Sequence, residues 1–417
     1  MCKYIVQGGN PLCGEINIQG AKNAVLPILA ASIITEGVTV IHNCPDIYDV
    51  KITLEILRHL GCSAYRDKNT VTIDSTNIST YIIPETLTRK MRSSVIFTGA
   101  ILARLGITEC SYPGGCELGL RPIDIHLKSF RQLGVDITEE DGFIKCKLDK
   151  FTPGHIHLGF PSVGATENLM LFACKQKGKT VITNCAREPE VVDLQEFLNL
   201  MGAKISGAGS SVIEIEGVPS LTPAEKTVMP DRIVAATMMF LAATTGSEFT
   251  LKNIVPLHID SISSLLKESG ALISTEKDRL HIKCSGRLNA PDSVQTMPYP
   301  GFPTDAQSQL MAALTTMRGT SIINETIFEN RFNTAAELKK MGADITIKDR
   351  VAVVRGINNL HSANLISPDL RGGAALVIAA LGVEGKSEIS NVCYIDRGYE
   401  NFDLTLRSIG GNIRKIN

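Results

Sequence analysis

Three side chains that could bind or activate an anionic substrate lie within one short stretch, Ser111 to His126: Cys116, Arg121 and His126. A proline and several glycines in this stretch predict a mobile loop with the cysteine at its tip. A thiol with a cation nearby ionises more readily, so Cys116 is a candidate nucleophile or proton donor. The alternatives are a surface cysteine without function and, for His126 taken alone, a structural histidine.

Charged residues also gather where apolar helices are expected to begin. They are Lys22, Arg92, Arg232, Asp305 and the pair Asp369 and Arg371. The free N–H groups and the dipole of a helix N-terminus attract anions, so these starts predict an anion-binding face. The alternative for Asp305 and Asp369 is an N-cap, and the alternative for Lys22 is an ordinary solvated lysine.

The elements that carry these residues recur six times. A helix-like run ends in a glycine and an alternating hairpin follows, at Gly61, Gly134, Gly202, Gly270, Gly342 and Gly410. A glycine there suits the left-handed C-terminal cap of a helix. Apolar helices, expected to be buried because they are apolar nearly all round, are predicted over 24–35, 93–105, 166–176, 232–245, 306–317 and 373–381. The chain is therefore an α/β (α+β) protein built from six repeats, each resembling βαβαββ.

The two ends of the chain are expected to meet in the sixth repeat. That repeat stops after one strand of its hairpin, and Tyr4 to Gly8 has the alternation and final glycine of the missing strand. Six repeats then divide into two domains of three, one over 22–229 and one over 1–21 plus 230–417. Two chain crossings predict a hinge and a cleft between these domains.

The loop around Cys116 is an insertion in one repeat. From Cys110 to Gly134 the second repeat counts 24 residues, whereas the corresponding interval in the first, third, fifth and sixth repeats counts 17. About seven residues have therefore been added to a single copy. An insertion confined to one copy favours function over packing, which strengthens the interpretation of Cys116 as a reactive thiol.

Composition limits the remaining possibilities. The 417 residues are 44% hydrophobic and 20% charged, with a formal net charge of -1, which gives no bulk reason to expect nucleic acid or a membrane surface as partner. Eleven cysteines without a repeated Cys-x-x-Cys spacing argue against a disulfide framework and a structural zinc site. No signal peptide and no membrane span is predicted. We expect a cytoplasmic monomer with no cofactor and no metal.

Several motifs together resemble the UDP-N-acetylglucosamine enolpyruvyl transferases. They are the Pro-Gly-Gly-Cys loop ending at Cys116 with the following Leu-Arg-Pro-Ile-Asp-Ile-His, and the segments Gly20–Ala24, Ser162–Asn168, Asn330–Phe332, Pro368–Arg371 and Ile395–Tyr399. The resemblance runs from residue 3 to about residue 415. It implies a two-domain inside-out α/β barrel with three repeats per domain, shared with enolpyruvylshikimate phosphate synthase.

The resemblance also implies a reaction. The 3′-hydroxyl of UDP-N-acetylglucosamine would attack C2 of phosphoenolpyruvate, and the resulting tetrahedral ketal would expel phosphate, in the first committed step of peptidoglycan synthesis. Catalytic residues implied in this way are Cys116, Asp305, Lys22 and Arg397. Asp305 would accept the hydroxyl proton, and Cys116 would engage phosphoenolpyruvate and be the thiol that fosfomycin modifies.

The resemblance assigns substrate contacts residue by residue. Phosphoenolpyruvate would be held by Lys22, Asn23, Arg121, Arg371 and Arg397. The UDP-sugar would be held by Asn23, Arg92, Arg121, Pro122, Asp124, His126, Ser162, Val163, Gly164, Asp305 and Ile327, with Arg331 and Asp369 in the same pocket. Some family members have a lysine just before the Ser-Val-Gly segment, where this chain has Phe160-Pro161. Diphosphate contacts on that side would then fall to backbone N–H groups near Gly164.

Two other functions remain as alternatives. The first is the sister reaction on shikimate 3-phosphate, against which stands the absence of the Gly-Thr-Ala-Met-Arg signature expected of those enzymes. The second is a non-catalytic six-repeat clamp around a polymer, which should show a basic inner face rather than apolar helices. Phosphate release from phosphoenolpyruvate with each acceptor would separate the three.

Overall fold

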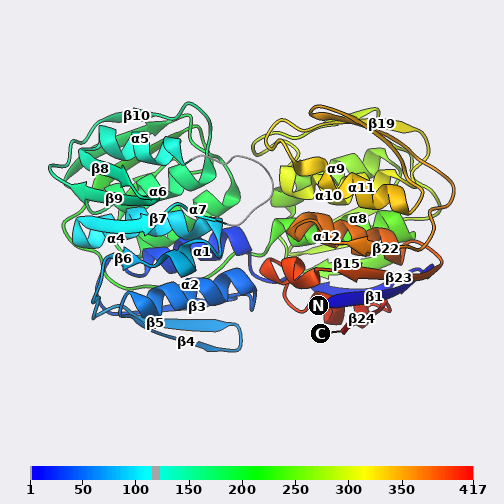
Figure 1. Cartoon of the computed structure of the whole chain (residues 1–417), viewed down its shortest axis with the longest axis horizontal. Helices are drawn as coiled ribbons and strands as arrows, with labels where there is room; N and C mark the ends of the chain where they lie inside the picture. Colours follow the sequence, from blue (N-terminus) through cyan, green and yellow to red (C-terminus); the bar gives the residue numbers. More distant parts are fainter. Residues whose placement is uncertain (1, 115–122, 417) are drawn as a thin grey trace. The chain divides into compact units, whose positions relative to one another are not determined.

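The computed structural model of the chain describes residues 2–114 and 123–416, so the predicted positions Cys116, Arg121 and Pro122 lie outside the described residues. The described residues form two compact lobes. The first lobe comprises residues 20–114 and 123–229, and the second comprises residues 2–19 and 230–416. Figure 1 shows the helices and strands of each lobe, and each lobe has its own continuous hydrophobic core.

The first lobe has three four-stranded sheets. The first sheet has the strand order β14 (Glu225–Thr227), β3 (Val38–His42), β5 (Thr70–Asp74) and β4 (Ser63–Asp67). The second has the order β6 (Ile82–Ile83), β7 (Ile107–Ser111), β9 (Phe143–Leu148) and β8 (Val135–Glu140). The third has the order β10 (His155–His157), β11 (Gly178–Thr183), β13 (Val212–Gly217) and β12 (Lys204–Ser206). The first two strands of each sheet run parallel and the other pairs are antiparallel.

The second lobe repeats this arrangement. Its sheets are β2 (Cys13–Asn17), β15 (Glu248–Lys252), β17 (Arg279–Lys283) and β16 (Leu272–Glu276); β18 (Ser293–Gln295), β19 (Thr320–Asn324), β21 (Val351–Arg355) and β20 (Asp344–Lys348); and β22 (Asn364–Ile366), β23 (Gly385–Ser390), β1 (Lys3–Gly8) and β24 (Asn412–Ile416). In the last sheet Tyr4 lies opposite both Ile389 and Lys415. The prediction that the N-terminal strand completes the sixth repeat is therefore confirmed.

Two repeats exchange their leading strands: the predicted domain bounds place these strands in the correct lobes, but the strand pairing was not predicted. In four repeats the strand before the buried helix pairs with the strand after it. β2 precedes the first buried helix in the chain but pairs with β15, and β14 precedes the fourth buried helix but pairs with β3. The chain passes from one lobe to the other directly after each of these strands, so each strand stays in the lobe that the chain is leaving.

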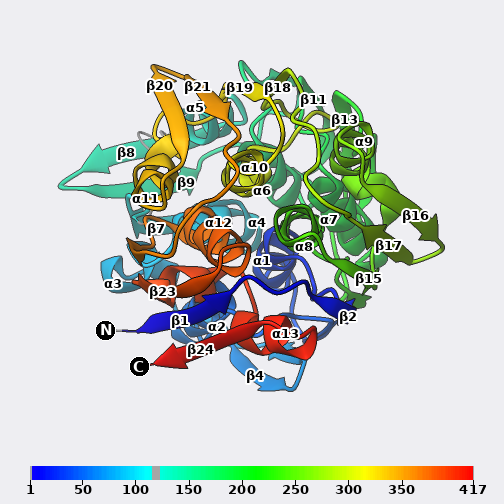
Figure 2. The same cartoon turned by 90° about the vertical axis from the view of Figure 1, so that its right-hand side faces the viewer.

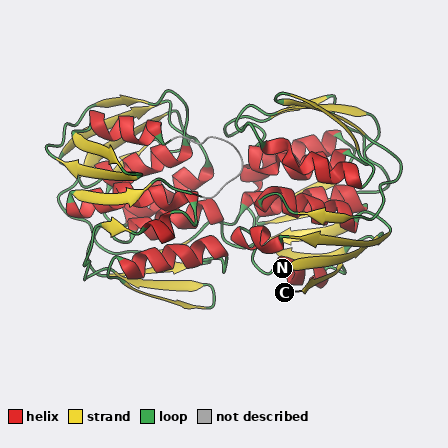
Figure 3. Ribbon diagram, viewed as in Figure 1, coloured by secondary structure: helices red, strands yellow, loops and turns green. Residues whose placement is uncertain are grey.

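Buried helices fill the interior of each lobe. They are α1 (Lys22–Ala31), α4 (Phe97–Leu105) and α6 (Val163–Ala173) in the first lobe, and α8 (Arg232–Thr245), α10 (Gln307–Leu314) and α12 (Leu370–Leu381) in the second. Two of them follow 3-10 turns, η1 (Arg92–Ile96) before α4 and η3 (Thr304–Ala306) before α10. Figure 2 shows α8, α10 and α12 end-on inside the three sheets of the second lobe, where they pack against one another. In each lobe the three buried helices lie inside the sheets, which confirms the inside-out architecture (Figure 3).

Several buried helices begin earlier than predicted. α8 has the predicted bounds, whereas α6 begins at Val163, α12 at Leu370 and α1 at Lys22. Glycines and polar residues in these first turns weaken the apolar periodicity on which the prediction relied. The shift matters because it moves Lys22, Gly164 and Arg371 into the first turns of helices.

The outer helices end as predicted. They are α2 (Tyr48–His59), α5 (Asp124–Gln132), α7 (Pro189–Leu200), α9 (Asp260–Glu268), α11 (Thr334–Lys340) and α13 (Phe402–Ser408), with the shorter elements α3 (Glu85–Thr88), η2 (Pro256–Ile259), η4 (Arg331–Asn333) and η5 (Val392–Arg397) between them. The six repeated glycines that follow have φ between 88° and 107°, in the left-handed region. Within the described ranges, no helix is long and apolar enough to cross a membrane.

Candidate active site

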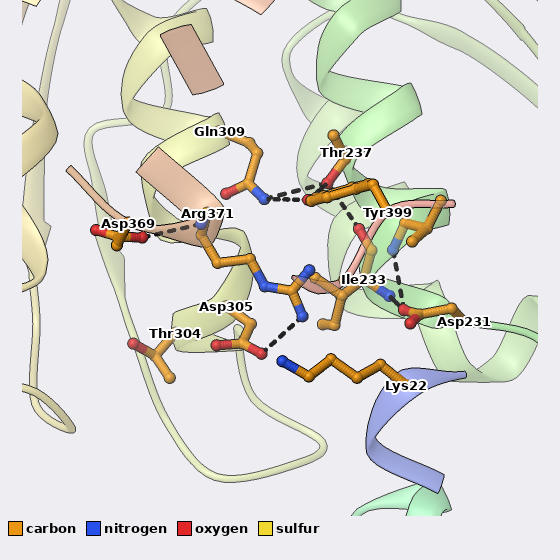
Figure 4. A network of polar contacts seen from close by, with 12 residues as sticks. Lys22, Asp231, Ile233, Thr237, Thr304, Asp305, Gln309, Asp369, Arg371 and Tyr399 are labelled. Atoms are coloured by element: carbon orange, nitrogen blue, oxygen red, sulfur yellow. Dashed lines mark hydrogen bonds and ion pairs between the residues drawn. The ribbon is translucent and has the colours of Figure 1, made fainter. Parts of the chain in front are cut away.

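The second lobe brings three predicted residues, Asp305, Arg331 and Arg371, into direct contact (Figure 4). Arg331 Nη2 donates to Asp305 Oδ1, and Arg371 Nη2 donates to Asp305 Oδ2 at 3.0 Å. Arg331 Nε donates to the backbone oxygen of Thr304 at 3.0 Å. All three charged residues lie at helix starts, in η3, η4 and the first turn of α12.

The side chain of Asp305 is more exposed than those of its two arginine partners. The side chains of Arg331 and Arg371 are 1% and 3% exposed, whereas that of Asp305 is 28% exposed. Burial alone would lower the pKa of Arg371, but Asp305 and then Tyr399 outweigh it and raise the pKa above its usual value. Arg371 therefore stays protonated. The arrangement presents a partly exposed carboxylate that two cations keep ionised and in one orientation, as a group that is to accept a hydrogen bond from a bound hydroxyl must be.

The N-cap interpretation is confirmed for one aspartate and wrong for the other. Asp369 Oδ1 accepts from the backbone N–H groups of Arg371 and Gly372 at 2.9 and 3.0 Å, and so caps α12. Asp305 is not a cap residue, because the caps of η3 and α10 are Pro303 and Ala306. The carboxylate of Asp305 thus pairs with the side chains of Arg331 and Arg371 rather than capping a helix.

A buried polar cluster of Tyr399, Thr237 and Gln309 lies beside Arg371, among the buried helices of the second lobe. The Arg371 guanidinium carbon lies 5.5 Å from the centre of the Tyr399 ring. The Tyr399 hydroxyl lies 2.7 Å from Thr237 Oγ1, and Gln309 Nε2 donates to both oxygens, at 3.2 and 3.1 Å (Figure 4). Sequence reasoning missed Thr237 and Gln309, although a polar residue inside an otherwise apolar helix is the signal that could have found them.

Glu325, also missed, fixes the loop that contains the predicted residue Ile327. Its buried carboxylate accepts from Thr296 Oγ1 at 2.9 Å and from Thr304 Oγ1 at 3.0 Å. It also accepts from the backbone N–H groups of Ile327 and Phe328 at 2.8 and 3.0 Å. One acid therefore ties the Ile327 loop to the turn that carries Asp305. Arg397, the last residue of η5, is half-buried in the same lobe.

In the first lobe Lys22 is an ion-pair partner rather than a solvated lysine. Lys22 Nζ lies 2.8 Å from Asp49 Oδ2, and the two side chains are 12% and 2% exposed. Lys22 is the first residue of α1 and Asp49 lies in the first turn of α2. Asn23, the next residue of α1, is partly buried. Sequence reasoning did not single out Asp49, because an acid in a first helical turn needs no functional explanation.

Four of the remaining first-lobe positions, Ser162, Val163, Gly164 and His126, lie together at the start of α6. Ser162 Oγ caps the helix by accepting from the backbone N–H of Ala165 at 3.3 Å, and Val163 and Gly164 form its first turn. A Cβ added to Gly164 would lie 3.2 Å from His126 Cε1 and 3.4 Å from its Nε2, so the imidazole lies directly against this turn. Burial and, after it, Arg92 of η1 lower the pKa of His126 to about 4. Asp124, the first residue of α5, is exposed.

Among the described residues, no group of three or more His, Cys, Asp or Glu is arranged to hold a metal ion. The geometry on both lobes is that of carboxylate, amide and cation groups at helix starts. The cations and the backbone N–H groups of helix starts can bind and orient anionic substrates directly.

Comparison with known proteins identifies the class to which this fold and these helix starts belong. The family described as EPSP synthase (3-phosphoshikimate 1-carboxyvinyltransferase) matches residues 6–406. The structure of the enolpyruvyl transferase NikO from Streptomyces tendae is 26% identical, with a TM-score of 0.89 over 99% of this chain and 98% of that one. EPSP synthase from Acinetobacter baumannii, 19% identical with a TM-score of 0.77 over the full length of both chains, shows the same fold. The class is that of the enolpyruvyl transferases.

Relatives with higher sequence identity show which family of enolpyruvyl transferases the chain belongs to. UDP-N-acetylglucosamine 1-carboxyvinyltransferase 2 of Caldanaerobacter subterraneus subsp. tengcongensis is 48% identical over 416 residues, covering 100% of both chains. UDP-N-acetylglucosamine 1-carboxyvinyltransferase 1 of Carboxydothermus hydrogenoformans is 46% identical over 417 residues, covering 100% of this chain and 99% of that protein. The chain belongs to the UDP-N-acetylglucosamine 1-carboxyvinyltransferase family.

Proposed function

We propose that this protein transfers the enolpyruvyl group of phosphoenolpyruvate to the 3′-hydroxyl of UDP-N-acetylglucosamine and releases phosphate. Full-length identity of 48% and 46% to the two relatives named above supports this choice of acceptor. The structural observation that carries the proposal is Asp305, a partly exposed carboxylate held between two buried arginines at a helix start.

Asp305 is the group that accepts the proton of the attacking hydroxyl. As the hydroxyl oxygen bonds to C2 of phosphoenolpyruvate, its proton passes to the carboxylate and C3 gains a proton, which gives the tetrahedral ketal. In the second step C3 loses a proton and the C2–O bond to phosphate breaks, which restores the double bond. The contacts from Arg331 and Arg371 hold the carboxylate in one orientation throughout, and this preorganisation favours the transition state.

Cationic side chains neutralise the phosphoenolpyruvate trianion. Lys22, Arg121, Arg371 and Arg397 take this role in the proposal, because guanidinium groups pair bidentately with carboxylate and phosphate oxygens. Cys116 supplies the thiol that engages phosphoenolpyruvate and takes part in proton transfer at C3. The support for Arg121 and Cys116 is their place in the sequence motif.

The UDP-sugar is held by the start of α6, namely Ser162, Val163 and Gly164, together with Arg92 and His126. Asn23, Arg121, Pro122, Asp124, Asp305 and Ile327 complete the set, with Asp369 capping the helix that carries Arg371. We further propose that the two domains span 22–229 and 1–21 plus 230–417, and that the enzyme is a cytoplasmic monomer and a fosfomycin target. Its product would enter cell-wall synthesis and so affect cell shape and division.

The test is phosphate release from phosphoenolpyruvate with UDP-N-acetylglucosamine or shikimate 3-phosphate as acceptor. Release with the UDP-sugar alone is the expected result. Phosphate release with shikimate 3-phosphate alone would show that the protein catalyses the sister reaction. Release with neither acceptor would indicate a binding protein without this activity.

Asp305→Ala should abolish phosphate release while UDP-sugar affinity changes only slightly. Asp344→Ala is the matched control, because Asp344 forms an exposed ion pair with Arg355 in the same lobe, with side chains 48% and 52% exposed. It should keep wild-type activity. A loss mainly of UDP-sugar binding in Asp305→Ala would make Asp305 a substrate-binding residue instead of the base.

A further inference from the structure

The side-chain amide of Asn168, on α6, has an orientation that backbone groups determine. Its Oδ1 accepts from the backbone N–H of Gly99 at 2.7 Å, and its Nδ2 donates to the backbone oxygen of Val95 at 2.8 Å. A backbone N–H can only donate and a carbonyl can only accept, so the oxygen and nitrogen ends cannot be interchanged. The side chain is 0% exposed, which makes both contacts costly to break.

This orientation determines the protonation of His126. Asn168 Nδ2 lies 2.9 Å from His126 Nδ1 and has a hydrogen to donate to it, so Nδ1 accepts and carries no proton. A neutral imidazole has one proton, which must then be on Nε2. The lowered pKa, caused by burial and by Arg92, keeps the ring neutral at physiological pH.

The Nε2–H group lies at the start of α6. His126 is 7% exposed, and within the described part of the chain the only hydrogen bond of its side chain is the one at Nδ1. Nε2 would be 3.4 Å from a Cβ on Gly164, so the glycine leaves space beside the ring. The first amides of a helix have no intrahelical acceptor, and Ser162 Oγ serves that of Ala165. The ring therefore adds a neutral donor to the backbone donors of Val163 and Gly164.

We propose that Asn168 is a positioning residue that holds His126 as the Nε2–H tautomer, so that the ring donates a hydrogen bond to a phosphate oxygen of a nucleoside diphosphate ligand at the start of α6. This inference rests on the proposed function and deepens it. Phe160-Pro161 places no cation immediately before Ser162, and neutral donors at a helix N-terminus can bind a phosphate without one. Asn168 acts through His126 and does not touch the ligand.

The first experiment observes the tautomer directly, by nitrogen-15 NMR of the histidine-labelled full chain at neutral pH. His126→Gln assigns the signal among the eight histidines. The expected wild-type spectrum shows a neutral ring protonated at Nε2. Asn168→Asp keeps the acceptor for Gly99 but places a carboxylate oxygen opposite Nδ1, so the proton should move to Nδ1 or the ring should become charged. A wild-type ring protonated at Nδ1, or an unchanged ring in Asn168→Asp, overturns the proposal.

The second experiment separates hydrogen-bond donation from shape, by calorimetric titration with UDP and with uridine. His126→Leu should lose about tenfold in UDP affinity relative to uridine, as expected for one hydrogen bond to a charged group. Asn168→Asp should lose a similar factor. His126→Gln, whose amide nitrogen can occupy the position of Nε2, should retain most of the affinity. Equal losses in His126→Gln and His126→Leu would overturn the donor role.

These outcomes are separable from the proposed function. Absence of phosphate release with UDP-N-acetylglucosamine would refute the transferase activity while leaving the tautomer measurement intact. A protein that releases phosphate but shows the Nδ1–H ring would refute only the role of Asn168. Melting temperatures of the three variants identify any that do not fold, and the wild-type spectrum alone still decides the tautomer.

Discussion

Replacing Arg331 by methionine tests whether the buried guanidinium holds Asp305 in place. The change keeps much of the side-chain volume but removes the contacts to Asp305 Oδ1 and to the Thr304 backbone oxygen. It also removes the cation–π contact with Phe328, whose ring centre lies 5.5 Å from the guanidinium carbon. Breaking a buried ion pair from one side costs about 3–5 kcal/mol. Asp305 is 28% exposed and keeps its contact to Arg371, so water can replace part of the loss. We expect destabilisation of about 2–3 kcal/mol.

The assay is differential scanning calorimetry of the full chain. For a lobe of this size, that loss of stability lowers the melting temperature by roughly 4–12 °C. Arg350→Met is the matched control, because Arg350 makes the same two kinds of contact, to Glu329 Oε1 at 3.0 Å and to the Thr326 oxygen at 3.2 Å. The Arg350 and Glu329 side chains are 46% and 58% exposed, so its removal should cost under about 0.5 kcal/mol.

A double-mutant cycle isolates the pair itself. Arg331→Met and Asp305→Asn should each destabilise the protein, and the double variant should be less destabilised than the sum of the two. Coupling of about 1 kcal/mol or more is expected for charged groups in contact. If Arg331→Met melted like Arg350→Met, or if the coupling were zero, the arginine would be filling space and the argument for an oriented Asp305 would fail.

Three further predictions concern other parts of the chain. Burial first, and then Glu190 and Glu188, raise the pKa of Glu167 well above its usual value, so its contribution to stability is complete at pH below the unfolded pKa and is lost as pH rises through the folded one. Glu167→Gln should therefore raise the melting temperature at pH 8 and flatten its pH dependence. The expected gain in the free energy of unfolding is about 1.4 kcal/mol for each unit by which the wild-type pKa is raised. Equal melting temperatures of variant and wild type at pH 8 would contradict this. Gly134→Ala should destabilise more than Gly202→Ala in chemical denaturation, because both have positive φ but only the first would press a Cβ against Lys150 O, at 1.9 Å. Cys116→Asp should keep turnover and resist fosfomycin whereas Cys116→Ala should nearly stop turnover, measured by phosphate release; a fully active Cys116→Ala would make the thiol a bystander.

The sequence alone determined the repeated architecture. Each repeat has a helix-ending glycine, and all six glycines adopt the left-handed conformation that the pattern required. The alternation in Tyr4 to Gly8 was enough to place the N-terminal strand beside β24. These features are local, because a few consecutive residues decide the period of a helix or strand and the conformation at its end. Motif resemblance added candidate site residues from both lobes and the prediction for Cys116, which lies outside the described residues.

Only the tertiary structure decided which side chains meet. Asp305 and Arg371 are 66 positions apart and Asn168 and His126 are 42 apart, and no spacing rule connects either pair. The pairing of β2 with β15 and of β14 with β3 was likewise not predicted, since both look like ordinary leading strands of a repeat. A hydrogen bond between distant residues depends on where separate helices begin relative to one another, and the packing of the buried helices sets that geometry in each lobe. Periodicity therefore predicts the elements and the residues at their starts, while packing selects their partners and protonation states.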